Sequence, residues 1–540
     1  MAPVKKPPSI DNQSDNQSDD QSDRPSDDRL DGPLLSARDP GRGGRALLAL
    51  VAGATLLYSL GLAGIDLWAP DEPRYAAIAE ELRSGRHGWT GAALLHLNGE
   101  PYGQKPPLYF WLAAAFGLPF GRVGELAARL PSAVAGVASV AGTYWIGRLL
   151  RLPTAATWLS AGLLATSFRF AFTARRAQLD VLLCAFELAA IALFLLIETR
   201  RGGIEAARRQ PALLFGLHAS LGAAALVKGP VGWLPLAVFA VHLAWEGRLA
   251  AYRNLVPAWS WLLSIGPLAL WIVAATALAP EGFARDAVGT NVIARFFAGT
   301  SHARPFYYYA YQLPLDFLPW SLLWPVAIAV LVRSASTSTT RFLTVWTLVP
   351  LAFFTLSAGK RGLYLLPTFP ALALMSVFAV TPPANPPTAP APQHPLPARV
   401  RGLAAAIATV ALLELAGALF VLPRLDPEKS PRPIALAIAS HAGPEEAVGL
   451  YGLRPLEGAL TYYGERRVRS LRDEVSARKF LDEGGRLILL RARDFERLRA
   501  DLTLTRLEDF RSGRRELVLA HRPAHSTLSI PESGPDRGDP

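Results

Sequence analysis

The sequence predicts a polytopic α-helical membrane protein with a small α/β domain near its C-terminus. Three observations carry this prediction: apolar runs recur between residues 45 and 423, only 18% of the 540 residues are charged, and mean hydropathy is +0.23. Each helical crossing of a bilayer needs about 20 mainly apolar residues. The composition excludes a wholly disordered chain, a collagen-like chain and a small disulfide scaffold, and the one cysteine, Cys184, allows no internal disulfide.

The first 44 residues predict a disordered, polar cytoplasmic tail. Residues 11–23 repeat Asp, Asn, Gln and Ser, which leaves almost nothing apolar to bury. After residue 44, apolar runs predict eleven spans, within an expected range of about 11–13. These runs are 45–65, 127–149, 154–173, 177–198, 211–227, 229–246, 255–279, 312–333, 341–357, 361–380 and 402–423.

The run 106–121 is short and begins with two prolines, so we expect a juxtamembrane or re-entrant helix there. If it does not cross, the arginine clusters between later spans all fall on the cytoplasmic side, as the positive-inside rule requires. The net charge of +11 is then a signal of topology, and no nucleic-acid partner is expected.

The remaining divisions follow from composition. We expect a membrane domain at 45–380 with a first outer loop at 66–106, a proline-rich linker at 381–400, a last span at 401–423, an α/β domain outside the cytoplasm at 424–525 and a frayed tail at 526–540. Runs at 447–452, 486–490 and 515–520 predict strands of the α/β domain.

Acidic side chains gather on the predicted outer face. Asp71 and Glu72 open an amphipathic helix, where a capping role is compatible with a catalytic one. Asp180 stands at the start of a span, and because a charge at membrane depth costs about 2.5–3.5 kcal/mol, it is a candidate site residue. The alternative is that Asp180 pairs with Arg176 in headgroup water.

Cations accompany these acids. Lys105 precedes Pro106 and Pro107, which open an interfacial helix and direct a positive charge at the plane of the lipid phosphates. A snorkelling lysine that needs no ligand is the alternative. Lys360, Arg361 and Arg295 have the same two interpretations. The nine histidines show no metal-ligand spacing, and nucleotide-binding loops are absent from the sequence.

Seven motifs carry a resemblance to a known family. In order they are DLWAPDEPRYAAIAEELRSG (66–85), LNGEPYGQKPPLYFWLAA (97–114), AARLPSAVAG (127–136), ARRAQLDVLLCAF (174–186), LVKGPVG (226–232), NVIARFF (291–297) and SAGKRGLYLLPTFPALAL (357–374). Together they resemble the lipid-carrier-dependent glycosyltransferases of the GT-C fold, in particular the aminoarabinose (lipid A) transferases and the protein O-mannosyltransferases.

The resemblance implies a glycosyltransferase in the bacterial inner membrane. Its donor would be a polyprenyl-phosphate sugar of the undecaprenyl-phosphate type, and its acceptor a glycolipid such as lipid A or a protein hydroxyl, at the periplasmic face. The implied roles are catalytic for Asp71, Asp180 and Glu72, donor-phosphate binding for Lys105, Arg295 and Lys360, and cavity lining for Arg74, Tyr75, Lys228 and Tyr364. Relatives carry an acid where this chain has Gln104, so a divalent metal, which the family would allow, is in doubt.

The available groups suggest a mechanism. Asp71 takes the proton of the acceptor hydroxyl, Lys105 stabilises the leaving phosphate, and transfer inverts the anomeric carbon. This requires that Asp71, Lys105 and Asp180 face one hollow on the outer side. A secondary transporter or a flippase for lipid-linked saccharides is the alternative function, although the sequence shows no repeated halves. A non-catalytic receptor built on the outer domain is a third.

Overall fold

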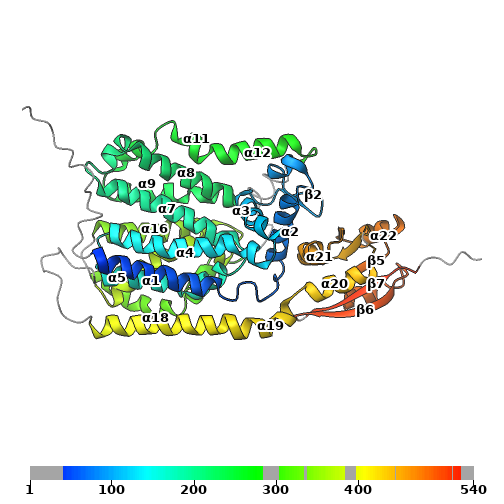
Figure 1. Ribbon diagram of the computed structural model, residues 1–540. Coiled ribbons are helices and arrows are strands. Elements are labelled where there is room, and N and C mark those ends of the chain that lie inside the picture. Colours follow the sequence, from blue (N-terminus) through cyan, green and yellow to red (C-terminus); the bar gives the residue numbers. More distant parts are fainter. Residues whose placement is uncertain are drawn as a thin grey trace, which may run out of the picture. The chain divides into compact units, whose positions relative to one another are not determined.

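The computed structural model describes residues 40–283, 303–333, 337–382, 397–443, 445–513 and 515–523. Long helices dominate its first part (Figure 1). The helices of this part are α1 (Pro40–Ser59), α2 (Asp71–Arg83), α3 (Leu108–Gly117), α4 (Glu125–Leu149), α5 (Thr154–Ala165), α6 (Phe168–Ala174), α7 (Leu179–Thr199), α8 (Pro211–Lys228), α9 (Leu234–Trp245), α10 (Tyr252–Leu255), α11 (Ser260–Ser264), α12 (Gly266–Leu278), α14 (Tyr308–Asp316), α15 (Trp324–Arg333), α16 (Ser338–Leu356), α17 (Phe369–Ser376) and α18 (Ala398–Ala416). The predicted tails and the proline-rich linker fall wholly or partly outside the described residues.

Six helices in the described part of the chain are long and apolar enough to cross a membrane, or seven if a bent pair counts as one span. The bent pair joins Tyr308–Asp316 to Trp320–Arg333 at 107°. The six include Pro211–Trp245, which holds two predicted runs. Several other predicted runs are broken into shorter helices. The run 154–173, for example, divides between α5 and α6, where the Trp320 indole donates to the backbone carbonyl of Thr166.

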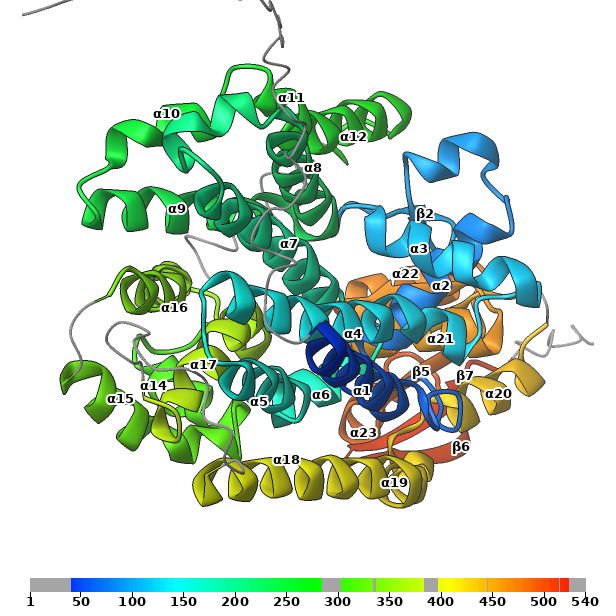
Figure 2. The ribbon, with the colours of Figure 1, turned by 60° about the vertical axis from the view of Figure 1, so that its left-hand side comes forward.

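Small residues bring the central helices close together. α7 packs against α4 on one side and α8 on the other (Figure 2). A Cβ atom placed on Gly142 of α4 would lie 2.7 Å from Leu188 of α7, and one on Gly147 would lie 2.9 Å from Thr157 of α5. Because interhelical packing in membranes depends on such close approach, these glycines set the spacing of the bundle.

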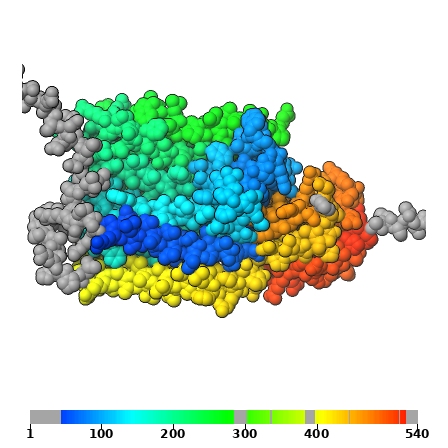
Figure 3. All heavy atoms as spheres, viewed as in Figure 1, coloured from blue at the N-terminus to red at the C-terminus, as the bar shows by residue number. Residues whose placement is uncertain are grey.

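α1 and α18 run along one face of the molecule, where the space-filling view shows them in blue and yellow (Figure 3). α18 belongs to a long helix, Ala398–His441, and only 6% of the 18-residue apolar stretch of this helix is buried in the protein. Leu412 and Leu413 of α18 are 67% and 66% exposed. An exposed apolar surface of this size is typical of a face that contacts lipid.

The segment between α1 and α4 builds a compact outer layer. α2 packs against α3, α4 and the short hairpin of β1 (His96–Leu97) and β2 (Glu100–Pro101). α3 has 10 residues, and with the following turn it forms an apolar helix, Leu108–Phe120, that is shorter than 18 residues.

The C-terminal part is a mixed five-stranded sheet in the order β4-β3-β5-β7-β6. β3 pairs in parallel with β4 and β5, while β7 is antiparallel to both β5 and β6. The elements are α19 (Leu422–Lys429), α20 (Arg432–His441), β3 (Val448–Tyr451), α21 (Glu457–Gly464), β4 (Val468–Leu471), α22 (Glu474–Asp482), β5 (Leu487–Arg491), α23 (Ala492–Leu498), β6 (Thr505–Ser512) and β7 (Arg515–His521).

Alternate residues of these strands enter two separate cores. Leu489 and Leu519 join the core that holds Ile438 of α20, whereas Ile488 and Val518 belong to the core that holds residues of α22 and α23. This two-residue period is the reason that the sheet is covered by helices on both faces. The three predicted strands correspond to β3, β5 and β7.

Candidate functional site

The first turn of α2 carries two adjacent acids with different surroundings. Asp71 and Glu72 are the first two residues of the helix, and the preceding Pro70 makes no side-chain cap. Negative charge is favourable there because unpaired N–H groups and the helix dipole converge at a helix N-terminus. Asp71 therefore lies in the first turn, and its carboxylate binds side chains instead of the backbone N–H groups of the helix.

Asp71 is held by three partners from different parts of the chain. Its Oδ1 accepts from Arg74, and its Oδ2 lies 3.4 Å from both Gln178 Nε2 and Arg361 Nη2. Burial alone would raise the pKa of Asp71, but Arg74 and Arg361 outweigh it, and the pKa lies below its ordinary value. The group is an ionised carboxylate flanked by two guanidinium groups.

Asp180 forms the second acidic centre, in the first turn of α7. It pairs with Lys228, the last residue of α8, and the Lys228 ammonium lies 4.6 Å from the centroid of the Tyr364 ring. The alternative pairing with Arg176 is not observed, since Arg176 binds Glu72 at 2.8 Å. Two membrane helices and the 3₁₀ helix η8 (Gly362–Thr368) therefore meet at this ion pair.

Arg361 connects the two acidic centres. Burial lowers the pKa of its guanidinium, but Asp71 and Asp180 both act in the opposite direction and the pKa is raised. Both carboxylates are thus close enough to act on one cation. Its side chain is 35% exposed, compared with 7% for Asp71, so Arg361 is the more accessible member of the group.

Glu72 points into the protein and is completely buried. Its carboxylate accepts from Arg129 Nε at 2.9 Å and from the backbone N–H groups of Trp68 and Ala177 at 3.0 and 2.8 Å, and it forms an ion pair with Arg176 Nη2 at 2.8 Å. Charge-assisted hydrogen bonds of this kind are strong in a buried site. In this conformation Glu72 has no surface to offer a substrate, and it fixes α2 to its neighbours.

Arg129 completes this buried network and was not anticipated. Its Nη1 donates to the carbonyls of Leu62 and Ile65 and its Nη2 to that of Asp66, at 2.7 to 2.9 Å. The loop before α2 is thereby fixed to α4. The signal in the sequence was a single arginine inside the apolar run 127–149, because an ionisable residue in a span needs a partner.

The other predicted residues are distributed unevenly. Lys105 is half-buried in the loop before α3, and Tyr75 is buried against the rings of Tyr109 and Phe110. Lys360 is 4% exposed and its ammonium donates to the backbone carbonyls of Ser357 and Arg304. The cation of this turn that reaches Asp71 is therefore the neighbouring Arg361. Arg295 lies outside the described residues.

A metal site does not fit the described residues. Gln104 offers an amide where the resemblance implies an acid, and an amide is a weaker ligand than a carboxylate for a hard cation. Within the ranges described above, no group of three or more His, Cys, Asp and Glu side chains could hold a metal ion. No step of the chemistry below is therefore assigned to a metal.

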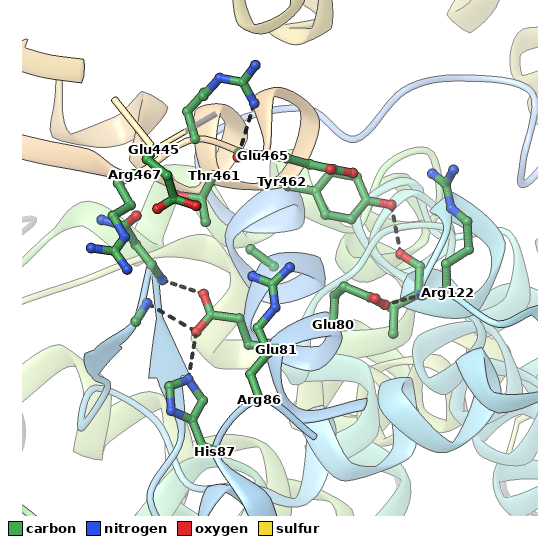
Figure 4. Close-up of a pocket in the computed structure, with 15 residues that line it drawn as sticks. Glu80, Glu81, Arg86, His87, Arg122, Glu445, Thr461, Tyr462, Glu465 and Arg467 are labelled. Atoms are coloured by element: carbon green, nitrogen blue, oxygen red, sulfur yellow. Dashed lines mark hydrogen bonds and ion pairs between the residues drawn. The ribbon is translucent and has the colours of Figure 1, made fainter. Parts of the chain in front are cut away.

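A cavity of about 510 Å³ is lined by Glu80 and Glu81 near the C-terminal end of α2 (Figure 4). Neither Asp71 nor any of its three partners lines it. Glu80 and Glu81 line it together with arginines and glutamates of the C-terminal domain. Glu81 is held by His87 and by the backbone N–H groups of Asn98 and Gly99. Four arginines and four glutamates line the cavity, so its charge favours neither anions nor cations.

Comparisons with known proteins point to one family. Residues 45–280 match the dolichyl-phosphate-mannose-protein mannosyltransferase family. An undecaprenyl phosphate-alpha-4-amino-4-deoxy-L-arabinose arabinosyl transferase of Pseudomonas savastanoi pv. phaseolicola is 31% identical over 422 residues, which are 75% of this chain and 73% of that protein. A second such transferase, from Pseudomonas fluorescens, is 31% identical over 341 residues, which are 61% of this chain. The aligned part spans only 55% of that relative's length.

A solved structure shares the fold. The crystal structure of ArnT from Cupriavidus metallidurans bound to undecaprenyl phosphate superposes with a TM-score of 0.70 at 21% identity, covering 88% of this chain and 97% of that one. This likeness, with the apolar helices and the sheet described above, confirms the predicted fold class of a polytopic helical membrane protein with a small α/β domain.

Proposed function

The chain belongs to the undecaprenyl phosphate-aminoarabinose arabinosyl transferase family, and we propose that it transfers a sugar from a polyprenyl-phosphate donor to a hydroxyl acceptor. The observation that carries this proposal is the gathering of acids and cations around Asp71, whose Oδ2 lies 3.4 Å from Arg361 Nη2, a guanidinium on which the charge of Asp180 also acts. A carboxylate beside fixed cations suits a reaction in which a hydroxyl loses a proton while negative charge develops on a phosphate.

In the proposed step, the acceptor oxygen bonds to the anomeric carbon as the bond from that carbon to the phosphate oxygen breaks. The hydroxyl proton passes to Asp71, and the electron pair leaves with the phosphate. Lys105 and Arg361 stabilise the leaving group electrostatically. A single displacement of this kind inverts the configuration at the anomeric carbon.

The cations around Asp71 imply that the donor binds before Asp71 accepts the proton. In the ligand-free site Arg74 and Arg361 lower the pKa of Asp71, which makes it a weak base. A donor phosphate that binds Arg361 competes with Asp71 for that cation and so strengthens the carboxylate as a base. Donor binding therefore prepares Asp71 to accept the proton, because it weakens the hold of Arg361 on the carboxylate.

Asp180 and Glu72 have supporting roles in this proposal. Asp180, paired with Lys228, orients the sugar or the acceptor at the side of the site formed by α7 and η8. Glu72 was predicted to be catalytic, but here we assign it a positioning role. Its carboxylate is fully buried, and its oxygens are occupied by three hydrogen-bond donors and by the ion pair with Arg176.

We place the chain in the inner membrane with its site on the periplasmic side, where a lipid carrier presents its sugar and the C-terminal domain stands. The names of the relatives support undecaprenyl phosphate as the carrier and an aminoarabinose as the sugar. A glycolipid such as lipid A is the first acceptor to test, followed by a protein hydroxyl.

The direct test uses the purified full chain in vesicles with undecaprenyl-phosphate aminoarabinose and lipid A. Mass spectrometry of the acceptor should show the added sugar with the parent chain and none with Asp71→Asn. Asp509→Asn, an exposed acid of β6, is the matched control and should transfer normally. Lys105→Ala should lose transfer and affinity for undecaprenyl phosphate, whereas Lys479→Ala, a lysine that is 68% exposed, should lose neither.

Two results would contradict the proposal. Transfer at the parent rate by Asp71→Asn would remove that residue from the mechanism. Movement of the intact lipid-linked sugar across the vesicle membrane, without transfer to lipid A or to a peptide hydroxyl, would favour a flippase instead.

A further inference from the structure

The C-terminal domain rests directly on the helix that carries Asp71. α21 and α2 lie beside one another in Figure 1, and the contact is closest at Gly458. A Cβ atom on Gly458 would lie 2.4 Å from Arg74 Cα and 2.7 Å from Arg74 N. Real side chains do not approach a backbone so closely, so the two helices touch backbone to backbone one turn after Asp71.

A second contact joins the edge of the C-terminal sheet to the same helix. The Asn98 side chain accepts from the Val468 N–H at 3.0 Å and donates to the Val468 carbonyl, which completes both hydrogen bonds of this residue at the edge of β4. The Asn98 N–H in turn donates to Glu81 on the last turn of α2. Asn98 therefore links β4 to the C-terminal end of α2.

Two tyrosines of α21 hold the segments on either side of α2. Tyr463 Oη accepts from the Leu67 N–H at 2.7 Å, and Tyr462 Oη donates to the Val123 carbonyl at 2.7 Å. The Val123 N–H donates to Glu80 of α2, also at 2.7 Å. α2 is thus held at its start, at its end and along its side by one domain.

We propose that the C-terminal domain is a positioning element for Asp71, with two positioning residues: Gly458 of the domain itself, and Asn98 of the outer loop, which binds Val468 of the domain. This rests on the proposed function for what Asp71 does, but the mechanical link to α2 does not. Arg74 contacts Gly458 through its backbone and binds Asp71 through its guanidinium. A displacement of α2 at Arg74 therefore moves the partner that fixes the carboxylate.

The kinetic test compares three variants of the full chain. Because a misplacement of about 1 Å at a catalytic group costs on the order of 10²-fold in rate, Gly458→Ala should lower kcat by about tenfold or more. The KM for the donor should stay within about twofold, since Lys105 and Arg361 are unchanged. Asn98→Ala should lower kcat less, because α2 keeps its contact at Gly458. Gly443→Ala is the control, since a Cβ there meets nothing nearer than 3.9 Å.

Hydrogen exchange gives a test that needs no substrate. In Gly458→Ala and Asn98→Ala the amides of residues 71–83 should exchange at least several-fold faster than in the parent, with no change in Gly443→Ala. If α2 exchanges at the parent rate in both variants, the positioning role is overturned, whatever reaction the protein catalyses. If Gly458→Ala does not fold, Asn98→Ala decides. A parent chain that transfers no sugar while its variants lose α2 protection would refute the proposed function and leave this link standing.

Discussion

The buried carboxylate of Glu72 allows a quantitative prediction for stability. Glu72→Gln keeps the size of the side chain and removes its charge. Four hydrogen bonds and one ion pair converge on the two carboxylate oxygens. Oε1 accepts from Arg129 and Ala177, and Oε2 accepts from Trp68 and Arg129 and pairs with Arg176. A glutamine offers one acceptor oxygen and one NH₂ group, so at least two donors lose their acceptor.

The expected loss follows from this count. Arg129 is completely buried and Arg176 is 11% exposed, so neither cation gains water when its counter-charge is removed. Breaking a buried ion pair by removing one partner costs about 3–5 kcal/mol. The free energy of unfolding should fall by that amount. The control Glu483→Gln, a surface acid that is 43% exposed and pairs with Arg469, should change it by less than about 1 kcal/mol.

The measurement is denaturant unfolding of the detergent-solubilised variants, compared as differences from the parent at one temperature. Arg129→Met and the double variant complete a cycle, and because the two residues share one network their effects should not add. A loss below about 1 kcal/mol for Glu72→Gln, equal to that of the surface control, would refute the reasoning that this charge is structural.

The sign of the pH dependence gives an independent check on the same residue. Burial would raise the pKa of Glu72, but Arg176 and Arg129 outweigh it and the pKa is lowered. A carboxyl whose pKa is lower in the folded state contributes stability above its unfolded pKa of about 4.3. That contribution is lost as the pH falls through the lower, folded value. The parent should therefore lose stability in this acidic range more steeply than Glu72→Gln.

Three further predictions concern the site. The pKa of Asp71 is lowered by its arginines against the effect of burial, so Arg361→Gln should move the acidic limb of the transfer rate to higher pH, measured as kcat/KM against pH. Arg361→Ala should weaken binding of undecaprenyl phosphate by about tenfold, or 1.4 kcal/mol, whereas Lys360→Ala, which loses contacts to backbone carbonyls, should lower thermal stability and leave that affinity intact. Lys228→Met leaves the Asp180 side chain, 7% exposed, without its cation, and should cost about 3–5 kcal/mol in the same unfolding assay.

The fold was predictable where the sequence repeats a simple pattern. Long apolar runs gave the membrane helices, and short ones gave β3, β5 and β7. β4 and β6 were missed because their residues, VRSL and TRLEDFRS, carry no apolar run: both are edge strands with exposed positions. The bend between α14 and α15 was missed for a similar reason, since apolar residues continue through the break.

The candidate site was predictable in its residue types and much less in its pairings. Asp180 stood out because a charge at membrane depth is costly, and Asp71 because it opens an amphipathic helix within a motif that carries the resemblance. Lys360 and Arg361 could not be distinguished from the sequence, because the two cations are adjacent; in the structure Lys360 binds the backbone carbonyls of Ser357 and Arg304, and Arg361 reaches Asp71. Arg129 was overlooked since a single arginine within a span does not reveal its partner.

The sequence by itself determined that the chain spans a membrane, that acids and cations gather beside its spans and that a small α/β domain follows. These properties depend on composition and on short-range periodicity. Only the tertiary structure decided which charges meet: Asp180 binds Lys228 across 48 residues, Glu72 binds Arg129 across 57 and Asp71 contacts Arg361 across 290. Such pairs form only after the helices have packed, because their geometry is set by how closely neighbouring backbones approach.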